Sequence, residues 1–354
     1  MGTHAHTSHL TRRQFIGAAT LAAGGFLLPR ALGGCASDTV QQDSEFPGPQ
    51  GEVDNSTHEE RNSFAEGVPS VFFSRSIDPE AMRSVYDAIG ATLNGSNIGV
   101  KLSTGEPGSN FLSTDLIGGL VGAVGGTIVE CNTAYGGQRS DSQSHYRVAA
   151  DHGFADIANF QIMDEDGSVA LPVEGGSHLD ENLVGAHFPE YDGFLVLSHF
   201  KGHAMAGFGG ALKNISIGMA SREGKCLIHT DGASRTSPWG GDTTAFQECM
   251  AEAAKPVVDA TGGNMPFVNV MNNLSVDCDC DGSPAPAKMA DIGILASRDP
   301  VALDQACVDL VYSADDDSAD LIERIESRGG EHVLQHAESI GLGSRAYRLV
   351  EITA

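Results

Sequence analysis

One segment of the chain, residues 198–229, concentrates the residue types that enzymes use for chemistry. It combines histidines, lysines and closely spaced glycines. Imidazoles transfer protons and bind metals, desolvated amines become nucleophilic, and glycines let the backbone approach a ligand and present N–H groups to anions. The spacing of a P-loop is absent, and Leu212 stands where a dinucleotide fingerprint needs its last glycine. For the segment as a whole, a binding or catalytic site is favoured over a tight turn with scattered polar residues.

A second cluster is the run Asp-Cys-Asp-Cys-Asp-Gly at residues 277–282. Its aspartates imitate the first half of a calcium loop, but Lys288 stands where the closing glutamate is required, so calcium of that kind is not expected. Cys278 and Cys280 point to the same side if the segment is extended. They either share one soft metal with ligands from elsewhere or form a disulfide. A plain polar loop remains an equal alternative.

Two further histidines, His332 and His336, lie four positions apart on an expected helix. This spacing suits a zinc pair, but the sequence offers no evident third ligand. We therefore interpret them as part of a solvated helix face.

The remaining cysteines do not form a recognisable cofactor cradle. The chain has seven cysteines, irregularly spaced, with no CxxCxxC run. A ferredoxin-type cluster cradle is therefore absent from the sequence, and the spacing does not resemble a disulfide scaffold.

Apolar strand patterns alternate with helical patterns along the body of the chain. Strands are expected at 98–102, 127–130, 193–198, 267–271 and 291–295, and helices at 112–124, 244–261, 300–312 and 317–327. This alternation predicts an α/β fold of two lobes, with mainly parallel sheets covered by helices. Sites in such sheets form at the carboxyl ends of strands, so we expect the site in the cleft between the lobes.

The N-terminal region predicts export. Arg12 and Arg13 form a twin-arginine element, an apolar run follows, and Leu-Gly-Gly-Cys ends at Cys35. We therefore expect a signal peptide at 1–34, the twin-arginine translocase as a partner, and lipidation of Cys35. Plain cleavage without lipidation is the alternative. Residues 35–67 read as a flexible acidic tether and 68–354 as the α/β domain, in one or two lobes.

The charge balance limits the partners. The chain carries 47 acidic and 21 basic residues, a net charge of −26. Such a surface repels nucleic acid and anionic lipid headgroups, which excludes both as partners. Contact with a membrane, on the outer side of the cytoplasmic membrane, is therefore expected only through the lipid anchor.

Four segments together resemble a bacterial and archaeal family. They are Lys-Gly-His at 201–203, Gly-Phe-Gly-Gly-Ala-Leu-Lys-Asn at 207–214, Cys-Asp-Cys-Asp at 278–281, and Ser-Arg-Asp-Pro-Val-Ala-Leu-Asp-Gln-Ala at 297–306. The family is labelled domain of unknown function, number three-six-two, or uncharacterised iron–sulfur-centre protein. The resemblance spans nearly all of 69–354. Some members carry an inserted ferredoxin-type cysteine run, which this chain lacks.

A weaker resemblance is to the nickel-pincer lactate racemase family, which has a His, a glycine pair followed by Lys, and a later His. Here His203, Lys213 and His229 have similar spacing. The resemblance implies that His203 transfers protons, Lys213 anchors a pincer cofactor and His229 binds the metal. Gln138 stands where that family has its other acid/base His, so the resemblance implies the pocket rather than the racemisation itself.

Three hypotheses about function follow from these observations. The first is an enzyme with a metal or a nickel-pincer-like cofactor, which performs redox or isomerase-like chemistry on a small anion. The second is an electron-transfer lipoprotein in which Cys278 and Cys280 hold iron–sulfur or another transition metal, and the third is a non-catalytic lipoprotein that binds a small anion. In the first reading Arg139 and Lys201 hold the anion beside His203, and His229 binds the metal. Cys278 and Cys280 are the metal ligands of the second reading. The cofactor-binding candidates are Gly207, Gly209, Gly210, Lys213 and Asn214.

Overall fold

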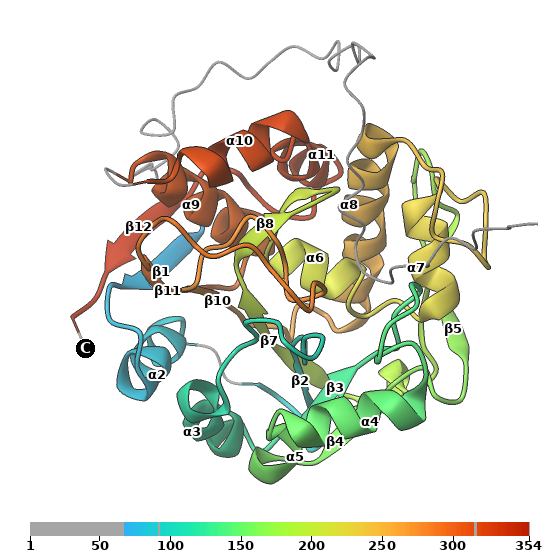
Figure 1. The fold of residues 1–354 in the computed structure, drawn as a ribbon, viewed down its shortest axis with the longest axis horizontal. Coiled ribbons are helices and arrows are strands. Elements are labelled where there is room, and N and C mark those ends of the chain that lie inside the picture. The colour runs from blue at the N-terminus through green and yellow to red at the C-terminus, as the bar shows by residue number, and fades with distance from the viewer. Residues whose placement is uncertain (1–66, 91–92, 315–316, 354) are drawn as a thin grey trace, which may run out of the picture. The chain divides into compact units, whose positions relative to one another are not determined.

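A computed structural model describes residues 67–90, 93–314 and 317–353 (Figure 1). Cys35, the twin-arginine element and the expected tether lie outside these residues. The described residues build a central sheet with helices on both of its faces. The α/β class, with mainly parallel strands covered by helices, is confirmed.

The central sheet has eight strands in the order β12-β1-β11-β10-β7-β2-β3-β4. The chain of strands from β10 to β4 is parallel throughout, whereas β11 is antiparallel to both of its neighbours. The strands are β1 (Ser70–Ser74), β2 (Ile98–Lys101), β3 (Thr127–Glu130), β4 (Phe160–Ile162), β7 (Gly193–His199), β10 (Phe267–Met271), β11 (Gly293–Ser297) and β12 (Arg348–Glu351). Two hairpins lie outside it, formed by β5 (Ser168–Pro172) with β6 (Glu181–Gly185) and by β8 (Lys201–His203) with β9 (Gly207–Gly209).

The helices divide between the two faces of the sheet (Figure 1). One face is covered by α2 (Pro79–Ala88), α3 (Thr114–Val124), α4 (Ser142–Asp151) and α5 (Phe154–Ile157). The other is covered by α6 (Ala211–Ser216), α7 (Arg222–His229), α8 (Thr243–Ala260), α9 (Pro300–Tyr312), α10 (Ala319–Ser327) and α11 (His332–Ser339).

Strand β7 shows why both faces need a cover. Leu195 and Leu197 point into the core beneath α2 and α3, whereas Phe194 and Val196 point into the core beneath α6 and α8. Successive side chains of a strand alternate between faces, so an unbroken apolar run such as residues 194–197 is buried only between two helical layers.

The predicted elements agree with the structure, with shifts at their ends. Helix α8 starts where the side chain of Asp242 accepts the N–H groups of Thr244 and Ala245, as a capping residue does. Strand β11 begins at Gly293, two residues later than expected, and the side chain of Asp291 before it accepts the backbone N–H of Asn273 in the loop that follows β10.

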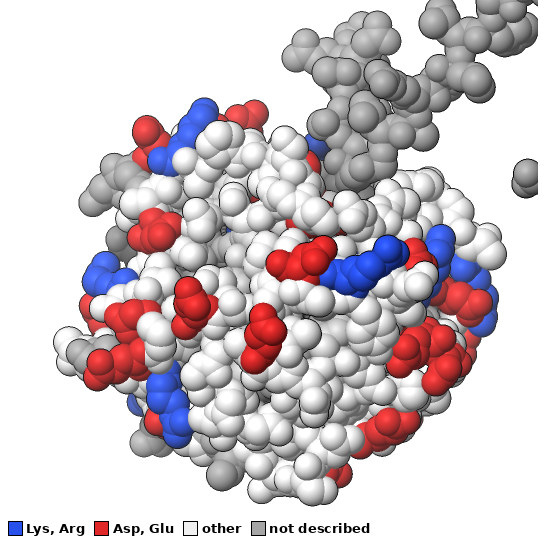
Figure 2. Space-filling model, turned by 60° about the horizontal axis from the view of Figure 1, so that its bottom comes forward, with Lys and Arg blue, Asp and Glu red and all other residues white. Residues whose placement is uncertain are grey.

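Acidic and basic side chains are mixed on the face of the molecule that Figure 2 shows. Figure 2 shows one face on which Asp and Glu side chains are dispersed among uncharged residues, with Lys and Arg between them. Within residues 67–90, 93–314 and 317–353, no helix has both the length and the apolar character needed to cross a membrane.

Candidate active site

A cavity lies at the carboxyl ends of β2, β3 and β7. Strands β3 and β4 continue the sheet on one side of β2, whereas β7 and β10 continue it on the other, so the chain changes direction between β2 and β7. Ligand sites of parallel sheets form at such a switch point. The space open to the centre of a water molecule is about 150 Å³.

Most of the predicted site residues meet in this cavity. The predicted residues that line it are Arg139, Lys201, His203, Gly209, Gly210, Lys213, Asn214, His229, Cys278 and Cys280. Gly207 lies outside the lining, at the turn of the β8–β9 hairpin, where φ is +80° and a side chain would be strained. The prediction that His203, Lys213 and His229 face a common cavity therefore agrees with the geometry.

The glycine pair sets the start of α6. An added Cβ on Gly210 would lie 2.3 Å from Oδ1 of Asp304. That buried carboxylate accepts the N–H groups of Ala211 and Leu212, at 2.7 and 2.9 Å, and so holds the first turn of α6. Burial raises the pKa of Asp304 to about 6, against the opposing effect of these hydrogen bonds. Glycine here lets α6 approach Asp304 and carries Lys213 to the cavity.

The hydrogen bonds of His203 define its tautomer. Its Nδ1 accepts the backbone N–H groups of Met205 and Ala206, at 3.2 and 2.9 Å. Burial, and next the charge of Lys213, lower the pKa of His203 well below its usual value. The ring is therefore neutral and carries its proton on Nε2, so it presents an N–H group rather than a lone pair.

His229 has the opposite tautomer. Its Nδ1 lies 2.6 Å from the carbonyl oxygen of Lys225, which only accepts, so Nδ1 carries the proton. Burial, opposed by this hydrogen bond and assisted by Lys213 and Lys225, lowers the pKa of His229 to about 4. The ring is neutral at pH 7, and its Nε2 presents a lone pair. This nitrogen fits a metal ligand or a general base.

Several buried cations surround these rings. Lys201 donates to Asp279 Oδ1 at 2.7 Å and to the carbonyl of Asn110 at 2.8 Å. Lys101 donates to Asn214 Oδ1 at 3.0 Å, and burial lowers the pKa of Lys101 to about 8, opposed by Glu130. Two lysine side chains that line the cavity are therefore held in place by hydrogen bonds to the protein.

Arg139 is engaged within the protein. Its guanidinium contacts Glu106 at 3.1 Å and Glu130 at 3.4 Å, and it also donates to Tyr135 Oη at 2.8 Å. Burial opposes its charge, but Tyr135, Glu130 and Glu106 outweigh burial and raise the pKa of Arg139. This arrangement favours a role in positioning the ends of β2 and β3 over the predicted role as an anion holder.

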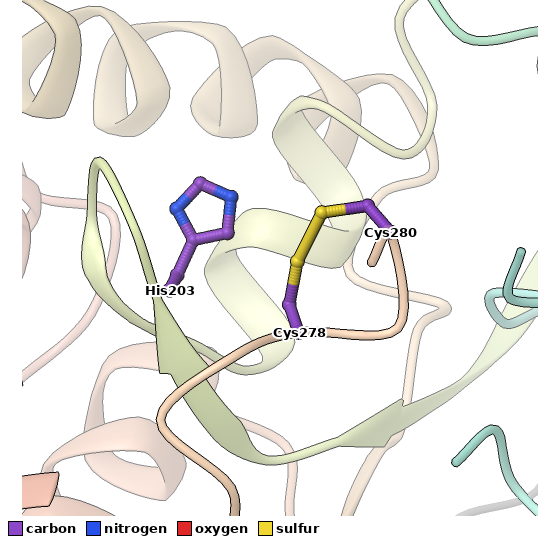
Figure 3. A group of neighbouring side chains, drawn as sticks. All are labelled: His203, Cys278 and Cys280. Atoms are coloured by element: carbon purple, nitrogen blue, oxygen red, sulfur yellow. A yellow bond between two sulfur atoms is a disulfide. The ribbon is translucent and has the colours of Figure 1, made fainter. Parts of the chain in front are cut away.

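Cys278 and Cys280 form a disulfide beside His203 (Figure 3). One nitrogen of His203 and both sulfur atoms lie within 4.8 Å of one another. A disulfide contains no thiolate, and His203 presents an N–H group to it, so these three residues do not fit a metal in this form. The predicted use of the cysteines as metal ligands applies only to the reduced pair.

Some lining residues were not predicted as part of the site. Lys101, Glu130 and Trp239 line the cavity, yet the sequence analysis assigned none of them a role there. Lys101 carried one usable signal, because a lysine inside an otherwise apolar strand needs a buried partner. Trp239 carried none, since it follows a proline in an irregular loop with no periodic pattern.

A family model described as Domain of unknown function (DUF362) matches residues 98–309. The chain belongs to this family. The match includes every predicted site residue except Cys35, so the DUF362 domain contains the whole cavity described above. No curated protein matches this chain in sequence.

Two solved structures are similar to this DUF362 protein in part. The lactate racemase apoprotein from Thermoanaerobacterium thermosaccharolyticum is 13% identical, with a TM-score of 0.38; the match covers 60% of this chain and 51% of that chain. A protein from Thermotoga maritima is 11% identical, also with a TM-score of 0.38; the match covers 65% of this chain and 59% of that chain. The chain thus spans between half and three fifths of these proteins.

Proposed function

We propose that this protein binds a small anion in the cavity and performs metal- or cofactor-dependent chemistry on it, of a redox or isomerase type. The charge of the cavity carries the proposal. Five cationic side chains line it, and three carboxylates line it or pair with these cations, in a chain whose net charge is −26. The cations are Lys101, Arg139, Lys201, Lys213 and Lys225. The carboxylates are Glu130 and Asp279 in the lining and Glu106 beside Arg139, so an excess of two positive charges remains. Such a concentration of positive charge in an acidic protein attracts anions.

The two histidines supply complementary chemistry. His229 offers a lone pair and His203 offers an N–H group, and the backbone holds each in that tautomer. His229 would hold a transition metal, which when bound supplies Lewis acidity toward an oxygen of the anion. His203 would donate a hydrogen bond to that anion. Lys213 would anchor a cofactor, with a nickel-pincer-like group as the candidate that the sequence resemblance implies.

The described residues do not favour an iron–sulfur cluster in this cavity. Such clusters are held by four thiolates. Three cysteines line the cavity, two of them are joined to each other, and burial raises the pKa of the third, Cys131, to about 12.

Metal analysis and intact mass of protein purified from its own host test the proposal. We expect a bound transition metal and a mass increment that disappears in Lys213→Ala. Lys255→Ala is the control, because Lys255 pairs with Asp259 outside the cavity. His229→Ala should lose the metal. A metal-free protein of unmodified mass that still binds phosphate or lactate would leave only the anion-binding reading; failure to bind either anion would refute the proposal.

The disulfide favours thiol–disulfide exchange as a second candidate function. The thiolate of an incoming dithiol attacks one sulfur of the pair, the S–S bond breaks, and the other cysteine leaves as a thiolate near Nε2–H of His203. The second thiol of the substrate then completes its own disulfide, leaving Cys278 and Cys280 as a dithiol. Equilibration with dithiothreitol, followed by alkylation and mass measurement, tests this. A pair that stays oxidised at every dithiothreitol concentration excludes it.

We also propose that the protein is exported through the twin-arginine route and anchored outside the cytoplasm by a lipid on Cys35. The support is the twin-arginine element and the Leu-Gly-Gly-Cys sequence. Fractionation tests this: Cys35→Ala should move the protein from the membrane fraction to the soluble fraction, and Arg12→Lys with Arg13→Lys should prevent export. Unchanged fractionation of both variants would contradict the proposal.

A further inference from the structure

The two side chains predicted to hold an anion already have carboxylate partners. Lys201 forms an ion pair with Asp279 at 2.7 Å. Arg139 contacts the carboxylates of both Glu106 and Glu130. All three carboxylates are buried, so an incoming anion would have to displace them to reach either cation. Other cations of the lining are therefore better placed to hold an anion.

Two buried lysines of the lining have only neutral hydrogen-bond partners. Lys101, at the end of β2, donates to the carbonyl of Leu102 and, at 3.0 Å, to Asn214 Oδ1. Lys225, in α7, donates to the carbonyl of Ala220 at 2.6 Å. The lysines are 1% and 6% exposed, and neither forms an ion pair with any residue that the structure describes. A buried ammonium group without an anion in contact is costly, so this pair is suited to a ligand that supplies one.

The hydrogen bonds of these lysines leave donors for such a ligand. An ammonium group has three N–H donors. Lys101 uses two of them in bonds to described residues, and Lys225 uses one. One donor of Lys101 and two donors of Lys225 therefore remain at residues that line the cavity.

One stretch of chain, from α6 to the start of α7, positions both ammonium groups. Asn214 in α6 accepts from Lys101, and Ala220 before α7 accepts from Lys225. Gly218 lies between them, and an added Cβ there would lie 2.8 Å from Nζ of Lys101, so glycine leaves the space for this ammonium group. Burial is the main cause of the lowered pKa of Lys101, and the charge of Lys225 lowers it further, against the effect of Glu130. The two charges are thus close enough to act on one ligand.

The charge balance of the cavity indicates the charge of that ligand. Its cations exceed the carboxylates by two positive charges. The neutral rings of His203 and His229 do not change this excess. Burial raises the pKa of the Cys131 thiol to about 12, so this lining residue is also neutral at pH 7. An anion with two negative charges would balance the excess, whereas a single carboxylate would leave one positive charge buried.

We propose that Lys101 and Lys225 hold the anion of this cavity, and that the anion is a phosphate group with two negative charges. This inference rests on the proposed function, because it names the ligand class of the same site. The oxygens of a tetrahedral phosphate accept hydrogen bonds from several directions at once, which suits donors from two separate lysines. Lys201 and Arg139 would position the surrounding backbone through their own carboxylate partners.

Calorimetric titration of the full chain with inorganic phosphate and with lactate, at pH 7 and one ionic strength, tests the proposal. We expect phosphate to bind more tightly than lactate. Lys101→Met and Lys225→Met should each weaken phosphate binding by about 10–100-fold, because each removes a hydrogen bond between charged groups. Each should also reduce the preference for phosphate over lactate. Lys255→Met is the matched control, because Lys255 pairs with Asp259 outside the cavity, and it should keep both affinities.

The outcomes separate this inference from the proposed function. Wild-type protein that binds lactate as tightly as phosphate would overturn the inference and leave anion binding in place. Wild-type affinity for phosphate in both cavity variants would do the same. Binding of neither anion by the wild type would refute both proposals.

A second measurement guards against loss of folding in a variant. Phosphate should raise the melting temperature of the wild type and of Lys255→Met, and raise it less in Lys101→Met and Lys225→Met. The ratio of the phosphate and lactate affinities is the decisive value, because a purely structural role of the two lysines would leave it unchanged. An unchanged ratio in both folded variants would overturn the inference.

Discussion

The cavity and the Glu248 group use histidine in opposite electrical environments. The Glu248 group consists of Glu248 on α8, with His178, His332 and His336 around its carboxylate. In the cavity, burial and neighbouring lysines lower the pKa of His203 and His229, so both rings are neutral. At the Glu248 group, hydrogen bonds to Glu248 and Asp231 outweigh burial and raise the pKa of His178. The first environment leaves the imidazoles neutral, as proton transfer or metal ligation requires. The second favours the protonated form of His178 between two carboxylates.

The comparison teaches that the partner of a histidine, more than its position in the sequence, decides what it can do. His229 donates to a backbone carbonyl, which cannot supply a charge, whereas His178 lies between two carboxylates. Backbone partners therefore select a tautomer, and burial keeps the ring neutral. Carboxylate partners select the charged form.

Asp279→Ala should have the largest effect on stability. It would leave the ammonium of Lys201 buried without its carboxylate, at 1% exposure, so we expect the free energy of unfolding to fall by about 3–5 kcal/mol. Denaturant unfolding measures this. Asp281→Ala is the control, since Asp281 accepts only a backbone N–H in its turn, and it should cost about 1 kcal/mol. Equal effects of both variants would show that Lys201 does not depend on Asp279.

The pH dependence of stability should separate the two histidine environments. The folded-state pKa of His229 is about 4, below the unfolded value of 6.5, so its contribution is present above pH 6.5 and is lost as the pH falls toward 4. We expect His229→Gln to reduce the acid destabilisation in this window by up to about 1.4 kcal/mol per pH unit. Denaturant unfolding at pH values from 4 to 7 is the measurement.

His178→Gln should act in the opposite direction in the same experiment. Its folded-state pKa is raised, so its contribution is fully present below pH 6.5 and is lost as the pH rises through the folded value. Its replacement should remove the gain in stability that the wild type shows as the pH falls from the folded pKa to 6.5, and should leave the slope below pH 6.5 unchanged, so the measurements extend to pH 9 for this variant. A change of slope below pH 6.5 in His178→Gln like that in His229→Gln would contradict the comparison.

His332→Ala should have a smaller effect than Asp279→Ala. Its ion pair with Glu248 is partly exposed, at 24% and 22%, and such pairs contribute about 1 kcal/mol or less. Thermal unfolding measures this. A loss as large as that of Asp279→Ala would mean that this ion pair acts as a buried element of the core.

Trp239→Ala should have the smallest effect on folding. Trp239 is 56% exposed but lines the cavity, so stability should change by no more than about 0.5 kcal/mol. Loss of its apolar contact should weaken anion binding about fivefold, equivalent to about 1 kcal/mol. Calorimetry with phosphate or lactate measures the binding. Unchanged affinity for both anions would place the bound anion away from this side of the cavity.

Much of the α/β architecture could be predicted because its signals are local. The strand at 193–198 and the helix at 300–312 follow from runs of apolar residues with the right period. Short elements such as β8 and β9 were not predicted as strands, because three residues carry too little pattern and their pairing depends on a turn at Gly207. The change of strand order between β2 and β7 is also invisible in any local pattern.

The sequence by itself determined the family, the α/β class and the glycine, lysine and histidine segment that lines the cavity. Only the tertiary structure decided the tautomers of His203 and His229, the engagement of Arg139 with Glu106 and Glu130, and the union of Cys278 with Cys280. It also placed Glu248 in contact with both His178 and His332, although the sequence analysis had assigned His332 to a solvated helix face. The physical reason is that residue type follows from the gene, whereas charge state and partner follow from contacts between segments far apart in the chain.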